Sequence, residues 1–268
     1  MKINFFEEYP TQENMTKLDL VDWPATILVA APSLTEFESI QLTYTQKYPH
    51  IIFGWWPTVA GSYWVSGFTN PSDLDRLFGE ITSKKQPHEL PILMDLELPL
   101  KKSLYIRNFF NIRKNKNKIA EFFNQAPNYN LKIYTAEYST LNNLFLKLWH
   151  FFGISPSFSF QHTKLVMCYS SMAVQPFEKS ILLKVKRFEK NFAQSNQSRV
   201  GFGLGTIATG VLGNEPILSP EDLSKDLRWA KESNVEEVFI FRLGGLNESY
   251  IGAIKENINN IDNISNFS

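Results

Sequence analysis

The sequence is poor in residues and patterns that would assign it to several common classes of protein. It has one cysteine, Cys168, which excludes a disulfide framework and a cysteine-based zinc site within one chain. Its four histidines, His50, His88, His150 and His162, have no metal-ligand spacing. No stretch is long and apolar enough to span a membrane. The 27 basic and 27 acidic residues cancel, so net charge predicts neither a nucleic-acid partner nor an anionic membrane partner.

The start of the chain also lacks a targeting signal. The segment MKINFFEEYP has no long apolar region of the kind that a secretory signal peptide carries. We therefore expect a cytoplasmic protein. With 43% hydrophobic and 14% aromatic residues, the chain can bury a large core. No linker, low-complexity segment or charge block divides it, so we expect a single domain over residues 1–268.

Apolar segments of strand length alternate along the chain with segments of helical spacing. Many strand-like segments are apolar on both faces, which is typical of parallel strands covered on both sides. Helix start signals stand between them: Ser33 with Glu36 has the pattern of a capping box, and Ser219 precedes Pro220. The expected strands are 2–8, 25–31, 50–56, 91–97, 131–137, 163–170, 199–205 and 237–243. The expected helices begin after Ser33, Asn70 and Ser219, and two more cover 177–192 and 248–258.

Eight strand–helix units predict a closed (β/α)8 barrel. Strand starts recur about every 33 residues, which is close to what a βα unit needs. Eight such units also match the roughly 250 residues that a barrel of this type contains. The alternative, a doubly wound open sheet, would bind a dinucleotide through glycines after its first strand, and the segment EEYPTQEN has none. We therefore predict an α/β fold, a (β/α)8 TIM barrel.

Two carboxylates end the fourth expected strand, in the segment PILMDLELP. Asp95 and Glu97 point the same way because strand side chains alternate between faces. Two like charges are costly to bury in a core. In a TIM barrel the carboxyl ends of the strands and the following loops build the active site, so we expect both at the barrel mouth, facing the axis. A purely structural pairing with Arg242 is the alternative.

Other polar and aromatic side chains are expected at the same mouth. Several strands end in a charged residue or a tyrosine, and the loop after the third strand is rich in aromatic residues. At most one of Trp55 and Trp56 lines the mouth, because neighbours on a strand point to opposite faces. An aromatic face suits the apolar face of a pyranose ring. The candidate catalytic residues are Glu97, Asp95, Tyr169 and Glu137, and the candidate substrate-binding residues are Glu7, Trp55, Trp64, Arg242 and Asn247.

On its fourth and sixth strands the sequence resembles the chitinase-like family 18 glycoside hydrolases. The segment MDLE (94–97) resembles the end of that family's D-x-x-D-x-D-x-E, and MCYS (167–170) resembles its M-x-Y segment. The resemblance implies a (β/α)8 barrel in which Glu97 is the general acid and Asp95 is its partner. It also implies that Tyr169 stabilises the reacting sugar.

The sequence departs from this pattern at three positions. Leu90 and Leu93 stand where the family has acids, and Ser170 stands where it has an aspartate. The chemistry itself needs only a proton donor and a second group at the anomeric centre. A neighbouring carboxylate raises the pKa of a glutamic acid, so that it can donate near neutral pH. We predict a carbohydrate-directed protein that acts on a small-molecule or oligosaccharide ligand, most simply a glycoside hydrolase without a metal or other cofactor.

A second function class is metal-dependent chemistry on a phosphorylated ligand. The glycine-rich segments 201–210 and 242–247 follow the last two strands, where backbone N–H groups often hold a phosphate. The acids Glu7, Asp95, Glu97 and Glu137 would then hold Mg²⁺ or Ca²⁺, in a lyase, an isomerase or a phosphodiesterase. The same glycines could instead only make room inside the barrel.

A third class is a barrel that binds a glycan or a protein and cuts nothing. The segment 141–160 is so rich in large apolar side chains that they exceed one helical stripe. Part of it could be exposed and form an oligomer contact, or the whole segment could be a buried helix with its loop.

Overall fold

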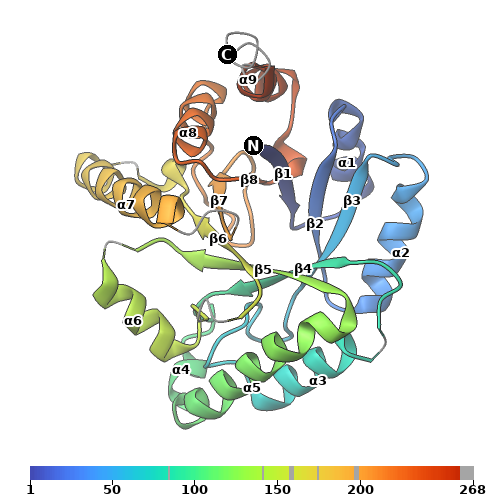
Figure 1. The fold of residues 1–268 in the computed structure, drawn as a ribbon, viewed down its shortest axis with the longest axis vertical. Helices are drawn as coiled ribbons and strands as arrows, with labels where there is room; N and C mark the ends of the chain where they lie inside the picture. Colours follow the sequence, from blue (N-terminus) through green and yellow to red (C-terminus); the bar gives the residue numbers. More distant parts are fainter. Residues whose placement is uncertain (84, 141, 157–159, 174, 196–198, 260–268) are drawn as a thin grey trace. The chain divides into compact units, whose positions relative to one another are not determined.

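Eight strands follow one another in chain order and close into a parallel barrel (Figure 1). The computed structural model describes residues 1–268 except 84, 141, 157–159, 174, 196–198 and 260–268. The predicted (β/α)8 barrel is confirmed, and the strand ends differ from the expected ones by at most three residues. The strands are β1 (Lys2–Glu7), β2 (Ala25–Ala31), β3 (Ile51–Pro57), β4 (Leu90–Leu96), β5 (Leu131–Tyr138), β6 (Thr163–Met167), β7 (Val200–Gly205) and β8 (Glu237–Phe241).

Helices occupy most of the connections between the strands. The two expected capping residues do cap: the Ser33 hydroxyl accepts the Glu36 N–H at 3.2 Å, and the Ser219 hydroxyl accepts the Asp222 N–H at 3.1 Å. The described helices are α1 (Gln12–Met15), α2 (Leu34–Thr45), α3 (Pro71–Ile81), α4 (Ser103–Arg107), α5 (Ile112–Gln125), α6 (Asn143–Phe152), α7 (Pro176–Ser195), α8 (Pro220–Glu232) and α9 (Glu248–Asn259). None of them combines the length and the apolar character that crossing a bilayer requires.

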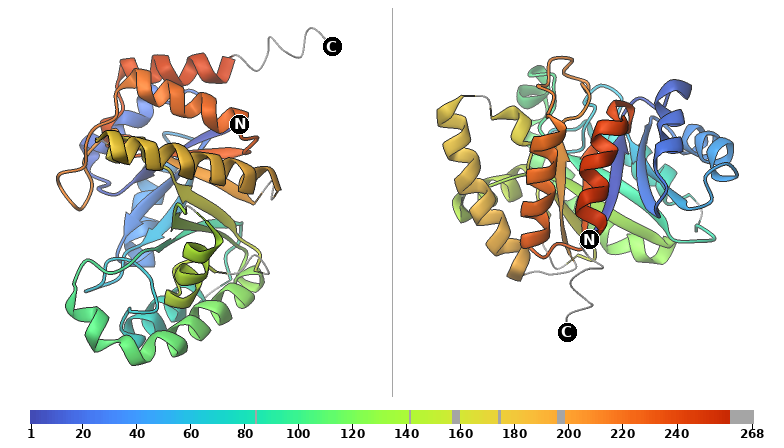
Figure 2. Two further views of the ribbon diagram at one scale, coloured as in Figure 1. Left: turned by 90° about the vertical axis from the view of Figure 1, so that its left-hand side faces the viewer. Right: turned by 90° about the horizontal axis from the view of Figure 1, so that it is seen from above.

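The chain divides into two compact units. Unit 1 comprises Met1–Ile27, Tyr48–Ile52 and Val166–Ser268, and unit 2 comprises Leu28–Lys47 and Phe53–Leu165. Three strands, β2, β3 and β6, run through both units, so neither unit is a continuous stretch of sequence. Within unit 1, α8 and α9 lie side by side in both views of Figure 2.

In unit 2, aromatic contacts identify the face of the sheet that the helices cover. The ring of Trp55 stacks on Phe37 of α2, with centroids 6.2 Å apart, and its indole N–H donates to the Ala31 carbonyl at 2.9 Å. Trp55 is aligned with Ile92, and Ile92 with Ile133. Aligned residues in neighbouring strands point to the same face, so these side chains form the helix-covered layer.

In unit 1, the same reasoning separates the two faces of β7 and β8. Phe202 stacks on Trp229 of α8, with centroids 4.4 Å apart, so it points toward the helices. Gly203, one residue later, points to the inner face and is aligned with Phe239. A Cβ added to Gly203 would lie 3.5 Å from the ring of Tyr169. The ring of Tyr169 therefore lies over the inner face of β7 at Gly203.

Candidate functional site

Asp95 stands near the carboxyl end of β4, on the face that the helices do not cover, and Glu97 follows directly after the strand. Asp95 is three residues from Ile92, whose side chain belongs to the helix-covered layer, so alternation places Asp95 on the inner face. Asp95 is buried, whereas Glu97, just beyond the strand, is half-buried. The pair therefore combines a shielded carboxylate with one that solvent can reach.

Tyr138, at the end of β5, contacts this pair. Its hydroxyl donates to Oε2 of Glu97 at 3.0 Å. Burial raises the pKa of the Tyr138 phenol strongly, and the negative charges of Glu97 and Asp95 raise it further. Tyr138 therefore stays protonated and acts as a hydrogen-bond donor to Glu97. The sequence places Tyr138 at the mouth, at the end of the fifth expected strand, but gives it no catalytic or binding role. Tyr138 lies two residues after Ala136, which is aligned with Asp95, so both are on one strand face.

The loop after β3 crosses the end of β4. The N–H of Val65 donates to the Asp95 carbonyl at 2.9 Å. Trp64, beside it, is buried, and its carbonyl accepts the Ser62 hydroxyl at 2.9 Å. Asn115 of α5 holds this loop in place. Its side-chain amide donates to the carbonyls of Gly67 at 2.9 Å and Thr69 at 2.7 Å. This loop fixes the backbone at Asp95.

Glu137 lies on the other face of its strand from the Asp95–Glu97 pair. It is aligned with Leu96, and it accepts the Thr135 hydroxyl at 2.7 Å. The ammonium of Lys164 on β6 lies 3.0 Å from its Oε2, and both side chains are buried. Glu137 is therefore one half of a buried ion pair on the helix side, and it does not join Asp95 and Glu97 around one point.

Glu7 and Arg242 form a largely buried ion pair in unit 1. Glu7 Oε1 accepts the Tyr9 N–H at 2.7 Å and lies 3.1 Å from the Arg242 guanidinium, and Oε2 accepts the Gly244 N–H at 2.7 Å. Burial raises the pKa of Glu7, and Arg242 and the backbone donors lower it by less. Arg242 also lies over the Tyr9 ring, 4.9 Å from its centroid. These contacts join the carboxyl ends of β1 and β8.

Glu8 and Glu215 approach each other next to the Glu7–Arg242 ion pair. A Cβ added to Gly210 would meet Glu8 Oε2 at 2.6 Å and Glu215 Oε1 at 3.0 Å. Glu215 is buried, and Oε1 accepts the Leu212 N–H at 3.1 Å. Sequence reasoning did not select Glu215, because it lies in the long β7–α8 connection and follows no strand end. A side chain at position 210 would collide with both carboxylates, so this position requires glycine.

Tyr169 lies on the inner side of unit 1. Its ring is 5.9 Å from that of Phe241, and Gly203 lies beneath it. The next residue, Ser170, donates a hydrogen bond to Asp226 of α8, which also pairs with Lys186. Ser170, which stands where the chitinase-like family has an aspartate, therefore connects the end of β6 to helix α8.

Two of the sequence candidates hold structural positions. Trp55 is fully buried between β3 and α2, so it presents no ring face to a ligand. Asn247 is exposed, and its side-chain oxygen accepts the N–H groups of Ser249 at 3.0 Å and Tyr250 at 3.2 Å. It caps the start of α9.

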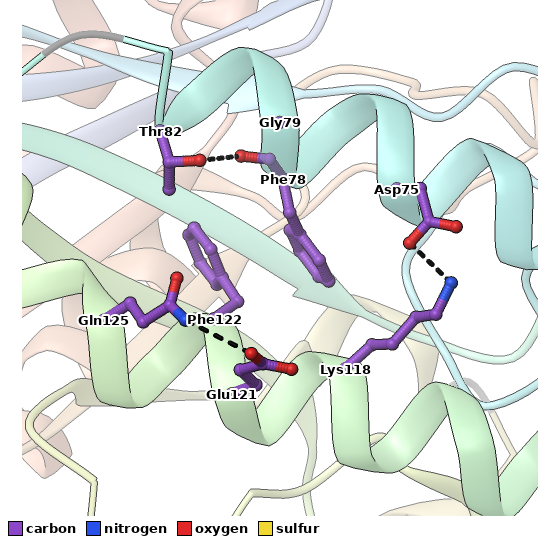
Figure 3. A pocket seen from close by; sticks show the side chains of 8 residues that line it. All are labelled: Asp75, Phe78, Gly79, Thr82, Lys118, Glu121, Phe122 and Gln125. Carbon is purple, nitrogen blue, oxygen red and sulfur yellow. Dashed lines mark hydrogen bonds and ion pairs between the residues drawn. The ribbon is translucent and has the colours of Figure 1, made fainter.

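Away from the strand ends, the described residues form one notable pocket and no metal site. Among the described residues, no group of three or more His, Cys, Asp or Glu side chains is arranged to hold a metal ion. A pocket of about 150 Å³ lies in the groove between α3 and α5 (Figure 3). The stacked rings of Phe78 and Phe122 and the Lys118–Asp75 ion pair line it. It lies on the helical layer, without the paired carboxylates of the β4 end.

Comparisons with known proteins support the fold assignment. No family model matches the sequence, and no curated protein matches it. Among solved structures, the spore cortex-lytic enzyme SleL of Bacillus cereus matches with a TM-score of 0.63 and 9% identity, over 96% of this chain and 74% of that chain.

Two further structures of similar size match over most of their length. A GH18 chitinase from Pseudoalteromonas aurantia matches with a TM-score of 0.58 and 10% identity, over 96% of this chain and all of that chain (100%). An L-ribulose 3-epimerase matches with a TM-score of 0.55 and 9% identity, over 99% and 98% of the two chains. The resemblance to chitinase-like barrels therefore holds at the level of the fold, which sugar epimerases share.

Proposed function

We propose that the protein is a carbohydrate-directed barrel that hydrolyses a glycosidic bond, with Glu97 as the proton donor. The observation that supports this proposal is the hydrogen bond from Tyr138 to Glu97, which lies two residues after the inward-facing Asp95 of β4. Glycoside cleavage needs a carboxylic acid that solvent and substrate can reach, and Glu97 is the half-buried member of the pair.

Each neighbour of Glu97 has a separate role in this proposal. Asp95 is the second carboxylate: it shares a strand face with Glu97, and one proton held between them relieves their mutual repulsion. Tyr138 orients the Glu97 carboxyl by its hydrogen bond. Glu7, Arg242 and Glu137 shape the barrel ends and do not take part in the chemistry.

The test is turnover of a panel of fluorogenic glycosides and natural oligosaccharides. The wild-type protein should release sugar from at least one of them, and Glu97→Gln should reduce kcat on a natural oligosaccharide by about 10²–10⁴-fold while substrate still binds. Glu121→Gln on the exposed side of α5 is the matched control and should keep full activity. Unchanged turnover of the natural oligosaccharide by Glu97→Gln would remove Glu97 from the mechanism. Binding of a glycan without turnover by the wild type would support a non-catalytic barrel.

A further inference from the structure

One surface of unit 2 carries large apolar side chains in contact with water. It is formed by α4, by the turn Phe109–Asn111 that follows it, by the start of α5 and by α6. Phe110 is 92% exposed, Ile106 is 83% exposed and Leu144 on α6 is 73% exposed. The exposed alternative for the segment 141–160 thus holds for the described part of α6; residues 141 and 157–159 lie outside the described residues. We call this surface the basic–aromatic face; its apolar members are Ile106, Phe109, Phe110, Leu144, Leu148 and Phe151.

The two parts of the basic–aromatic face meet at Phe68. The Phe68 ring lies 5.0 Å from that of Tyr105 on α4 and 5.4 Å from that of Phe152 on α6, measured between centroids. The Lys116 side chain of α5 packs against Gly153, which ends α6. Figure 1 shows α4, α5 and α6 together in the lower part of the ribbon. These contacts bring α4 and α6, which carry the exposed apolar side chains, to opposite sides of Phe68.

The same surface is strongly basic. No acidic residue occurs between Glu97 and Glu121, a stretch that holds seven lysines and arginines, and none occurs between Glu137 and Glu178. The zero net charge of the whole chain hides this local excess. The cations of the face are Lys101, Lys102, Arg107, Arg113, Lys114 and Lys147, and within the described residues none of these six forms an ion pair.

The combination of charge and apolar exposure selects the partner. A second copy of the chain would bring cations against cations, which is repulsive. A single-stranded nucleic acid would use the charges and stack bases on Phe109 and Phe110, but Ile106, Leu144 and Leu148 offer no aromatic face. A bilayer with anionic headgroups supplies both a negative surface and an apolar layer just beneath it.

We propose that the basic–aromatic face docks the protein on an anionic lipid bilayer. Ile106 and Phe110 enter the region between headgroups and acyl chains, and the six cations contact the headgroups. This docking is peripheral and does not depend on the chemistry at Glu97.

Co-sedimentation with lipid vesicles tests the proposal. The full chain should bind vesicles of equal parts phosphatidylcholine and phosphatidylglycerol, bind more weakly at high salt, and not bind vesicles of phosphatidylcholine alone. Arg113→Gln with Lys114→Gln should lower the partition coefficient by about 30-fold, since each cation near such a surface contributes about 1 kcal/mol. Ile106→Ser with Phe110→Ser should lower it by at least about 10-fold.

Two matched variants serve as controls. Leu42→Ser removes an equally exposed leucine (74%) from α2, and Arg228→Gln with Lys231→Gln removes the same charge from α8. Both should bind like the wild type. Absence of wild-type binding to the anionic vesicles, or equal weakening by the controls, would overturn the proposal. So would wild-type binding to single-stranded RNA, but not to vesicles, that the face variants abolish, or a wild-type dimer that dissociates in Phe110→Ser.

Discussion

At the scale of single residues, Glu7 shows how burial and pairing compete. Its carboxylate has four described donors, including Arg242, yet burial raises its pKa above the ordinary value of 4.5. A carboxyl with a higher pKa in the folded protein stabilises the fold most below its unfolded pKa, and this contribution is lost as pH rises through the folded pKa.

The consequence can be measured against Glu7→Gln. The advantage of the wild type over this variant in free energy of unfolding should shrink from about pH 4 to about pH 7. Urea unfolding across this range measures it, and the exposed Glu13→Gln should show a flat difference. An advantage that grows with pH would mean that the attraction of Arg242 exceeds the cost of burial.

The Lys164–Glu137 pair makes a second prediction at this scale. Both side chains are buried, so Lys164→Met leaves the Glu137 charge uncompensated and should cost about 3–5 kcal/mol of stability. The double variant Lys164→Met with Glu137→Leu removes both charges and should recover most of that loss. Chemical denaturation of the single and double variants decides it. A double variant as unstable as Lys164→Met would contradict a coupled ion pair.

Tyr138 offers a prediction about the proposed chemistry. Its hydroxyl stabilises the ionised form of the Glu97 carboxyl by a hydrogen bond. In Tyr138→Phe, the alkaline limb of the pH–rate profile should therefore move to higher pH, because the acid keeps its proton longer. Tyr134→Phe, on the same strand face, should leave the limb in place. If the alkaline limb does not move in Tyr138→Phe, the hydrogen bond from Tyr138 does not influence the catalytic acid.

At the scale of elements, the loop after β3 depends on Asn115. This fully buried side chain donates to two carbonyls of the loop, those of Gly67 and Thr69. Asn115→Ala would leave both carbonyls buried without these donors and should cost about 2–4 kcal/mol. Asn117→Ala, exposed on the same helix, should change stability by less than about 0.5 kcal/mol. Thermal unfolding compares them, and equal effects would contradict the buried role.

The strands could be predicted from the sequence because they are apolar, β-branched segments between clear helix start signals. The helices after Ser33 and Ser219 followed from capping residues that do accept the expected N–H groups. Helix α5 could not be predicted in this way, because its first half is IRKNKNK and its key inward residue is a polar one, Asn115. Its buried residues Ile112, Ile119 and Phe122 do fall at helical spacing, but the polar run between Ile112 and Ile119 interrupts the apolar stripe.

The site was predictable only in part. Strand alternation predicts a shared face for Asp95 and Glu97, since that rule needs only the register of one strand. The rule does not say which face is inner, so Trp55 and Glu137 were candidates although both lie on the helix-covered side. Tyr138 and Glu215 required contacts between distant segments, which one sequence does not display.

At the scale of the whole molecule, the two proposals place function on different parts of the barrel. The inner carboxyl ends of the strands hold the proposed acid, and the outer helices α4 and α6 carry the basic–aromatic face. The net charge is a sum over the whole chain, so its value of zero does not reveal the local positive charge of the basic–aromatic face. Length and strand count were sufficient for the fold, because eight βα units of this size have few other arrangements.

The central claim, that Glu97 donates a proton to the leaving oxygen, is tested most directly by varying the leaving group. The measurement is kcat/KM of the wild type and Glu97→Gln on two glycosides of one sugar, one with an alkyl and one with a nitrophenyl leaving group. An alkyl oxygen needs protonation to leave and a nitrophenolate does not. The account predicts a loss of about 10²–10⁴-fold on the alkyl glycoside and a much smaller loss on the nitrophenyl glycoside. An equal loss on both substrates, or no loss on either, would contradict it.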